Sequence, residues 1–475
     1  SDTENDAAII FAPKGTYISR GKTLSVLNEA AYSLSNSEEA RETLRVLSEH
    51  MDELTPAEQR IVELREKALR FRSRVPVDEY VAYQELLNEA ATVWREAKAT
   101  SDYAMFEPLL QRIIDACRRF AELVEPETDP YDFWLDNYEE GMTQEFCDKF
   151  FAELRAKLVP LIAKVGAAEP PDTSLLNVRF PLDKQAELSG WLMRFLGLDP
   201  DRSALTTTEH PFTIDFSRYD VRITTKYYED AFASSMFSVI HEGGHALYEL
   251  GTAEEYAFTQ LGRGVSMGVH ESQSRFFENI IGRSRAFCSL AWPELVRLCP
   301  ELGRYDADMF YRAVNAAQPG LIRIEADELT YSLHIMVRYE LERAMLHGEL
   351  NAKELPERWN ALYKQYLGVD VPDDARGVLQ DSHWSGGQLG YFPSYALGSA
   401  YGAQLVARMK EGFDVDAAVA SGDLAPVRSW LGERIWSHGS LRKPTELMRS
   451  ALGGEFDASW YTNYLEAKMR EVYKL

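Results

Sequence analysis

Residues 238–247 read Ser238-Val239-Ile240-His241-Glu242-Gly243-Gly244-His245-Ala246-Leu247. Apolar residues recur at helical spacing through this segment and its flanks, which predicts a helix over about 233–250. His241 and His245 are four residues apart, so on a helix both imidazoles project from one face and can hold one metal ion. Glu242 lies on the adjoining face, where its carboxylate can act on water instead of binding the metal. This arrangement, H-E-x-x-H, is typical of zinc peptidases.

Two glycines inside the predicted helix support this interpretation. A glycine in a helix interior costs about 1 kcal/mol relative to alanine, so Gly243 and Gly244 need a compensating reason. Close approach of a ligand or of a neighbouring helix would supply one. The alternative for the motif is a pair of core histidines bonded to backbone carbonyls, which leaves both glycines unexplained.

A catalytic zinc site needs a third protein ligand and one open position. Beyond Gly251, which ends the predicted helix, a second helix is expected to begin near Val269-His270-Glu271-Ser272. The separation of Glu271 from His245 lets an antiparallel helix present the carboxylate to the same ion. Glu271 is therefore the leading third ligand. His270 is the alternative, because it is adjacent and imidazole also binds zinc.

The rest of the chain has mainly helical periodicity. A capping box with proline at the first helical position, Thr55-Pro56-Ala57-Glu58, begins one helical segment. Two segments, 212–216 and 221–224, alternate with period two around a short polar turn, which predicts a β-hairpin. We therefore expect a mostly α fold with one small β-sheet. The other amphipathic segments cover about 78–98, 103–124, 143–165, 184–197, 266–288, 306–317, 321–347, 354–367 and 445–452.

The breaks between these segments are short. Prolines and glycines at 125–130 and 166–174 indicate turns or brief linkers rather than long flexible tethers. We expect a single domain over residues 1–475, with an N-terminal helical part at 1–205 and the part that carries the metal motif at 206–475.

The composition argues against several classes of protein. The chain has 475 residues and a mass of 54.0 kDa, and 45% of its residues are hydrophobic, which suffices for a large core and argues against disorder. A net charge of −24 disfavours partners such as nucleic acid and anionic membrane surfaces. No signal peptide and no apolar stretch long enough to span a bilayer are visible. The scattered cysteines form no C-x-x-C pair, which indicates reduced thiols and a cytoplasmic location: Cys117, Cys147, Cys288 and Cys299.

Taken together, the motifs resemble those of the carboxypeptidase Taq family of zinc metallocarboxypeptidases. They are, in order, His210-Pro211-Phe212, Asp220-Val221-Arg222-Ile223-Thr224, His241-Glu242-Gly243-Gly244-His245, His270-Glu271-Ser272, Ile322-Arg323-Ile324-Glu325-Ala326-Asp327-Glu328 and Gly377-Val378-Leu379-Gln380-Asp381-Ser382-His383-Trp384. The N-terminal segment departs from the family pattern. Members usually carry a Trp-Asp pair before a Met-Pro segment, whereas this chain has Ile10-Phe11-Ala12-Pro13-Lys14-Gly15.

The resemblance implies one zinc ion per chain, replaceable by cobalt, held by His241, His245 and Glu271, with Glu242 as the general base. It also implies a helical, saddle-shaped fold with a deep cleft, related to oligopeptidases of the neurolysin type and assembled as a homodimer. The expected activity is the removal of C-terminal residues from peptides with broad specificity, with proline disfavoured. Peptides with a free C-terminus are then the expected substrates.

An exopeptidase needs a group that binds the C-terminal carboxylate of its substrate, and arginine can do so with two parallel hydrogen bonds. The resemblance points to Arg323 for this role. The alternative from the residues alone is a surface ion pair of Arg323 with Asp327, four positions later on a helix.

The segment 380–395 supplies further candidates. A histidine and two phenols lie in a stretch rich in turns, where they can face the cleft and donate to the developing oxyanion. The family pattern favours His383 and one of Tyr391 and Tyr395, without deciding between the tyrosines. Gln380 and Tyr391 are further candidates for substrate binding.

Arg222 has two interpretations of equal weight. It lies on the predicted strand over 220–224, which can bind an extended peptide by strand addition, with Arg222 contacting the substrate. Alternatively, Arg222 holds the hairpin in place.

Two other functions compete with a carboxypeptidase. An oligopeptidase that cleaves internal bonds can use the same motifs, and its products distinguish it. A helical scaffold with a structural zinc is disfavoured, because structural sites fill all four positions with protein ligands, and here only three good candidates accompany Glu242.

Overall fold

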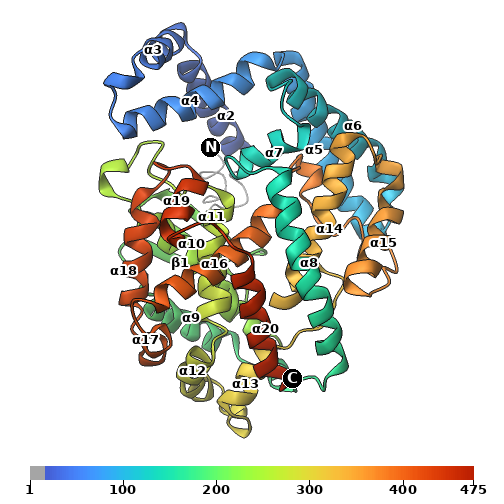
Figure 1. The fold of residues 1–475 in the computed structure, drawn as a ribbon, viewed down its shortest axis with the longest axis vertical. Helices are drawn as coiled ribbons and strands as arrows, with labels where there is room; N and C mark the ends of the chain where they lie inside the picture. The colour runs from blue at the N-terminus through green and yellow to red at the C-terminus, as the bar shows by residue number, and fades with distance from the viewer. Residues whose placement is uncertain (1–16) are drawn as a thin grey trace.

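The computed structural model describes residues 17–475, which form a mainly helical molecule with one small sheet (Figure 1). This confirms the predicted fold class. The N-terminal segment that the sequence singled out, 10–15, lies outside the described residues. Within residues 17–475, no helix has both the length and the apolar character needed to cross a membrane.

The first half of the described chain is helical. Its α-helices are α2 (Tyr17–Ser35), α3 (Glu38–Glu49), α4 (Pro56–Arg74), α5 (Val77–Thr100), α6 (Tyr103–Val124), α7 (Pro130–Tyr138), α8 (Gln144–Ala167) and α9 (Leu182–Leu196). The predicted capping box begins α4: the hydroxyl of Thr55 accepts from the amide of Glu58, and the Glu58 carboxylate accepts from the amide of Thr55.

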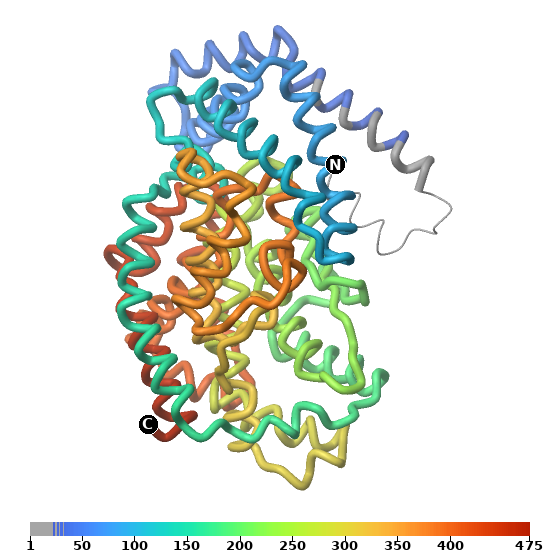
Figure 2. The backbone as a smooth tube through the Cα atoms, turned by 90° about the vertical axis from the view of Figure 1, so that its right-hand side faces the viewer, coloured from blue at the N-terminus to red at the C-terminus, as the bar shows by residue number. Residues whose placement is uncertain are grey.

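The second half is also helical after the sheet. Its α-helices are α10 (Phe232–Leu250), α11 (Met267–Arg275), α12 (Arg285–Leu298), α13 (Ala307–Val314), α14 (Glu328–His347), α15 (Leu355–Leu367), α16 (Pro393–Lys410), α17 (Val415–Ser421), α18 (Ala425–Arg434), α19 (Pro444–Leu452) and α20 (Ser459–Tyr473). In Figure 1, α2–α4 lie at one end of the long axis and α12 and α13 at the other. The long helix α8 runs along one side of the molecule beside α20 (Figure 2).

The sheet contains β1 (Ser203–Thr207), β2 (Thr213–Ser217) and β3 (Asp220–Thr225) in the order β1-β3-β2. The antiparallel β2–β3 pair is the predicted hairpin, and it is confirmed. The parallel strand β1 was not predicted, because Ser-Ala-Leu-Thr-Thr shows no clear alternation. Because β3 is hydrogen-bonded to β1 on one side and to β2 on the other, it has no free edge for a peptide. The prediction of strand addition at 220–224 is therefore wrong.

Two predicted helices have different bounds. The segment 266–288 contains α11, then a π-helix at Phe276–Ile281, and then the start of α12. The segment 321–347 becomes helical only from Glu328, because Asp327 adopts extended backbone and its side chain caps α14. Before it, Arg323–Glu325 form one 3₁₀ turn.

Glycines bring α11 close to two helices. A Cβ on Gly244 of α10 would lie 2.7 Å from the Gln273 carbonyl oxygen of α11. One on Gly398 of α16 would lie 2.7 Å from Cβ of Glu271. On the other side of α10, a Cβ on Gly243 would lie 2.4 Å from Leu196 of α9. The predicted close approach of neighbouring helices at Gly243 and Gly244 is therefore present.

Candidate metal centre and active site

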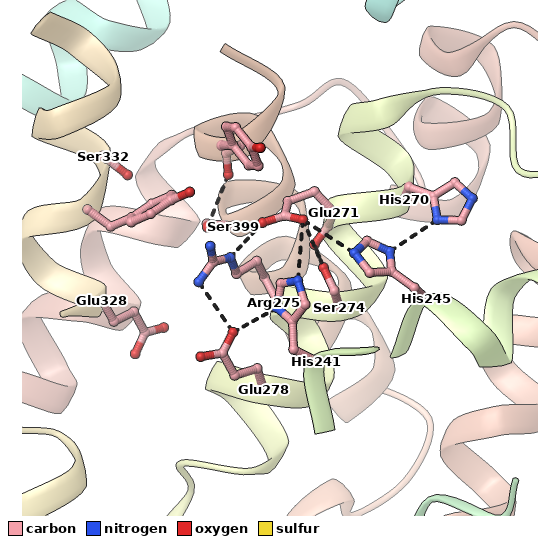
Figure 3. Close-up of polar contacts among 12 residues, drawn as sticks. His241, His245, His270, Glu271, Ser274, Arg275, Glu278, Glu328, Ser332 and Ser399 are labelled. Carbon is pink, nitrogen blue, oxygen red and sulfur yellow. Dashed lines mark hydrogen bonds and ion pairs between the residues drawn. The ribbon is translucent and has the colours of Figure 1, made fainter. Parts of the chain in front are cut away.

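His241 and His245 of α10 converge on Glu271 of α11 (Figure 3). Glu271 Oε2 lies 3.8 Å from His241 Nε2 and 3.6 Å from His245 Nε2. One ligand atom from each side chain lies within 4.8 Å of the other two. Two imidazoles and a carboxylate are a donor set of catalytic zinc sites, and these spacings allow all three atoms to reach one ion.

The outer nitrogens of the two histidines are already bonded. His241 Nδ1 lies 2.9 Å from Glu278 Oε2, and His245 Nδ1 lies 3.1 Å from Nδ1 of His270. Each histidine therefore keeps Nε2 for a metal while a neighbour fixes its ring, as is usual for histidine ligands. The residues present fit a bound zinc ion.

His270, the alternative third ligand, lies outside this donor set. Its ring stands behind His245, with Nδ1 bonded to that histidine and Nε2 2.5 Å from Glu249 Oε1. Both ring nitrogens are thus engaged, and the structure favours Glu271 as the third ligand.

A network of charges holds Glu271 ionised. The Nε–H of Arg275 donates to Glu271 Oε1 at 2.7 Å, and the Ser274 hydroxyl donates to Oε2 at 3.1 Å. Burial alone would raise the pKa of Glu271, yet the charges of Arg275 and His241 and these hydrogen bonds hold it below its usual value. An ionised carboxylate is the form that binds a metal.

Glu242 lies beside the donor set without joining it. The Thr213 hydroxyl, on β2, donates to Glu242 Oε2 at 2.6 Å and orients the carboxylate. Burial raises the pKa of Glu242 above its usual value, against the opposing effects of His241 and Thr213. A carboxylate with a raised pKa is a stronger base than an exposed one.

A cavity of about 750 Å³ opens onto this centre, and both His241 and Glu242 line it. Arg323 also lines it and is 6% exposed. The guanidinium is held by Asp381, whose Oδ1 accepts from Nε at 2.9 Å, and by the hydroxyl of Tyr331 at 3.0 Å. The alternative of a surface pair with Asp327 is wrong, because Arg323 is buried and bonded to these other groups.

The structure distinguishes the two candidate tyrosines by position. Tyr395 lines the cavity, whereas Tyr391 is not among its described lining residues. His383 stacks on Tyr391 with ring centres 5.4 Å apart, and its Nε2 lies 3.2 Å from the Tyr395 hydroxyl oxygen. Burial, followed by the charge of Arg323, lowers the pKa of His383 to about 3, so its ring is neutral. His383 is thus not among the described lining residues of the cavity, but it contacts Tyr395, which lines it.

Neither Gln380 nor Arg222 is among the described lining residues of the cavity. The Gln380 side-chain oxygen accepts from the backbone amide of Arg323 at 2.9 Å, which positions the arginine. Arg222 is bonded to Asp220 at 2.6 and 2.8 Å, and its guanidinium lies 4.8 Å from the centre of the Phe216 ring. This placement favours the hairpin-holding role for Arg222.

Several residues of the centre were not singled out by sequence. Arg275 and Glu278 follow Glu271 by four and seven positions, so helical spacing alone would have placed them on its face. Asp381 stands inside a quoted motif, but its pairing with Arg323 and with Arg338 depends on tertiary structure. Thr213 also depends on the fold, because it approaches Glu242 from the sheet.

Comparison with known proteins agrees with this geometry. A model of the carboxypeptidase Taq (M32) metallopeptidase family matches residues 5–469, and the chain belongs to that family. It is 40% identical over 467 residues to Carboxypeptidase 1 of Bacillus subtilis, covering 98% of this chain and 93% of that protein. It is 39% identical over 433 residues to Thermostable carboxypeptidase 1 of Thermus thermophilus, covering 89% and 85%.

A solved structure shares the whole architecture. The M32 carboxypeptidase from Deinococcus radiodurans R1 superposes with a TM-score of 0.94 at 36% identity, covering 98% of this chain and 94% of that one. The protein is therefore a metallocarboxypeptidase, a hydrolase of peptide bonds.

Proposed function

We propose that the protein is a zinc-dependent carboxypeptidase that releases C-terminal amino acids from peptides with broad specificity. The observation that carries this proposal is that Arg323 lines the same cavity as His241, Glu242 and Glu271. Arg323, which can bind the substrate's carboxylate, therefore lines the same cavity as two of the metal ligands and the base.

His241, His245 and Glu271 would hold the ion. When bound, zinc supplies a Lewis acid that polarises the scissile carbonyl and lowers the pKa of water toward neutrality. Cobalt is expected to substitute, since the same nitrogen and oxygen donors bind it.

Glu242 accepts a proton from the attacking water and returns it to the departing amine. Its raised pKa and its hydrogen bond from Thr213 support this role, because they provide a base in one orientation. Tyr395 donates from its hydroxyl to the developing oxyanion. His383 Nε2 lies 3.2 Å from that hydroxyl oxygen and positions the phenol.

Arg323 binds the C-terminal carboxylate. Asp381 and Tyr331 fix the guanidinium before the substrate arrives, which reduces the entropy lost on binding. The cavity volume of about 750 Å³ supports broad specificity, since it leaves room for side chains of different size.

Three further expectations belong to the same proposal. The chain forms a single domain over residues 1–475, supported by one cluster of buried apolar residues that extends from Val75 to Tyr473. It assembles as a homodimer and acts in the cytoplasm, where its four buried cysteines stay reduced.

The products of digestion test the proposal. An N-blocked peptide is incubated with the enzyme, and the free amino acids are identified over time. One amino acid released per step from the C-terminus, lost on chelation and restored by zinc or cobalt, supports the proposal. Internal fragments would instead support the endo-acting oligopeptidase, and no C-terminal release with any metal would overturn the assignment.

A further inference from the structure

The two metal-binding histidines have chemically different outer partners. His241 Nδ1 meets the carboxylate of Glu278 directly, at 2.9 Å. His245 Nδ1 meets another imidazole, that of His270, at 3.1 Å. The second imidazole in turn contacts a buried carboxylate, with His270 Nε2 2.5 Å from Glu249 Oε1. Each ligand is thus connected to a carboxylate, once directly and once through a ring. Figure 3 shows the contacts of His241 with Glu278 and of His245 with His270.

The position of each proton along the second connection follows from the chemistry of the ligand. A histidine that binds a metal through Nε2 carries its proton on Nδ1. His245 then donates from Nδ1, so His270 must accept at its own Nδ1. The remaining proton of His270 is on Nε2, where it is donated to Glu249 Oε1. A doubly protonated His270 would place two N–H groups face to face and is incompatible with this arrangement.

The ring of His270 has little freedom to leave this position. A Cβ on Gly264 would lie 2.4 Å from His270 Nε2, so the loop backbone closes against the ring. The Tyr248 ring also packs against it, with its centre 4.8 Å from that of His270. The amide of Gly264 also donates to Glu249 Oε1 at 3.0 Å.

The carboxylate at the end of the connection is equally constrained. Glu249 follows His245 by one helical turn on α10, and it is 4% exposed. His270 precedes Glu271 on α11. The connection therefore joins the two helices that supply all three metal ligands.

We propose that Glu249 and His270 form a positioning pair that fixes the tautomer and ring orientation of the metal ligand His245. The pair rests on the proposed function, and neither residue is among the described lining residues of the cavity. Its effect is on metal affinity and on the geometry of the bound ion.

Metal binding tests the pair independently of catalysis. Zinc affinity is measured by competition with a chromophoric chelator, and ligand geometry by the visible absorption of the cobalt-substituted protein. We expect His270→Leu to weaken zinc binding by about 10–100-fold and to change the cobalt spectrum. Glu249→Gln keeps an acceptor oxygen but loses the charge, so its loss should be smaller than that of Glu249→Leu.

His270→Gln is the conservative variant, since its side-chain oxygen can accept from His245 Nδ1. It should recover part of the affinity lost in His270→Leu. His347→Gln, a change at a histidine bonded to Asp129 at the far end of α14, is the matched control and should bind zinc like the wild type.

Unfolding of the metal-free variants separates loss of fold from loss of metal affinity. If metal-free His270→Leu unfolds at a lower denaturant concentration than the metal-free wild type, its weaker zinc binding can reflect loss of fold. His270→Gln and the two Glu249 variants then decide whether the pair positions His245. Zinc affinities within twofold of the wild type and an unchanged cobalt spectrum in the folded variants would overturn the positioning pair. Failure of the wild type itself to bind zinc would instead overturn the proposed function.

Discussion

Among single residues, Glu242 offers the most direct test of the proposed chemistry. Glu242→Gln preserves the size of the side chain and an oxygen that can accept from Thr213, but the amide cannot take a proton. We expect kcat to fall by about 10²–10⁴-fold while bound zinc, measured by atomic absorption, stays at the wild-type level. Glu349→Gln, at an exposed position just beyond α14, should keep full activity. Near-native turnover in Glu242→Gln would exclude the assigned role.

Arg323 separates recognition of the substrate's end from the chemical step. Arg323→Lys keeps a positive charge beside Asp381 but loses the two parallel donors that match a carboxylate. We expect kcat/KM for peptides with a free C-terminus to fall by about 10–100-fold. The same peptides with an amidated C-terminus provide the internal control and should lose little of their residual rate. Equal losses on both substrates would remove carboxylate binding from Arg323.

At the scale of elements, the site depends on how closely three helices approach one another. Gly398→Ala would place a methyl group 2.7 Å from Cβ of Glu271, so α16 and α11 must separate. We expect it to lower the free energy of unfolding by about 1–3 kcal/mol and to weaken zinc binding. Denaturant titration of the metal-free protein measures the first effect, and chelator competition measures the second.

The matched control is another helical glycine. Gly166→Ala lies at an exposed position of α8, where an added Cβ meets nothing within 4 Å. It should leave stability unchanged or raise it by up to about 1 kcal/mol, because alanine favours helix. A Gly398→Ala protein as stable as Gly166→Ala would contradict the importance of the close contact.

Helix α14 connects to the segment of His383 and Tyr391 through a buried carboxylate. Glu342 accepts from Trp384 Nε1 at 2.8 Å and from the amide of Gly390 at 3.0 Å. Burial raises the pKa of Glu342 to about 7, although these donors oppose the shift. Its contribution to stability is therefore complete below the unfolded value near 4.5 and is lost as pH rises through 7.

Glu342→Gln removes this titration. Between pH 5 and pH 8 the wild type should lose about 2 kcal/mol more stability than the variant, as the raised pKa dictates. Denaturant unfolding of both proteins at several pH values measures the difference. A parallel pH dependence in the two proteins would show that Glu342 does not titrate in this range.

Local pattern predicted some of these elements and missed others for identifiable reasons. The helix of His241 and His245 was predictable because its apolar spacing, its motif and its glycines agree. The π-helix at Phe276–Ile281 was not, since its residues also suit an α-helix. The pattern at 321–347 extends the helix back over Arg323, because spacing alone does not show that Asp327 caps α14. Its burial follows from contacts with Asp381, far along the chain.

At the scale of the whole molecule, the net charge of −24 opposes the approach of anionic substrates. The positive charges that attract the substrate's carboxylate are confined to the site, and Arg323 is one of them. We expect kcat/KM for acidic peptides to rise between low ionic strength and about 0.15 M salt, where the Debye length shortens to about 8 Å. Neutral peptides of the same length are the control and should change little. A fall with salt for acidic peptides would show that local attraction exceeds the global repulsion.

Helix α16 carries both Tyr395 and Gly398, three residues apart and therefore less than one turn. Because Gly398 has no side chain, the backbone of α16 packs directly against Glu271. The helix therefore fixes the spacing between the backbone of Tyr395 and Glu271. Helical rise, about 1.5 Å per residue, sets the distance along the helix axis between the Cα atoms of Tyr395 and Gly398, and the Tyr395 rotamer then places the hydroxyl. We therefore expect that replacing zinc by an ion of different radius changes the distance between the ion and Tyr395, while the spacing between α16 and α11 stays the same.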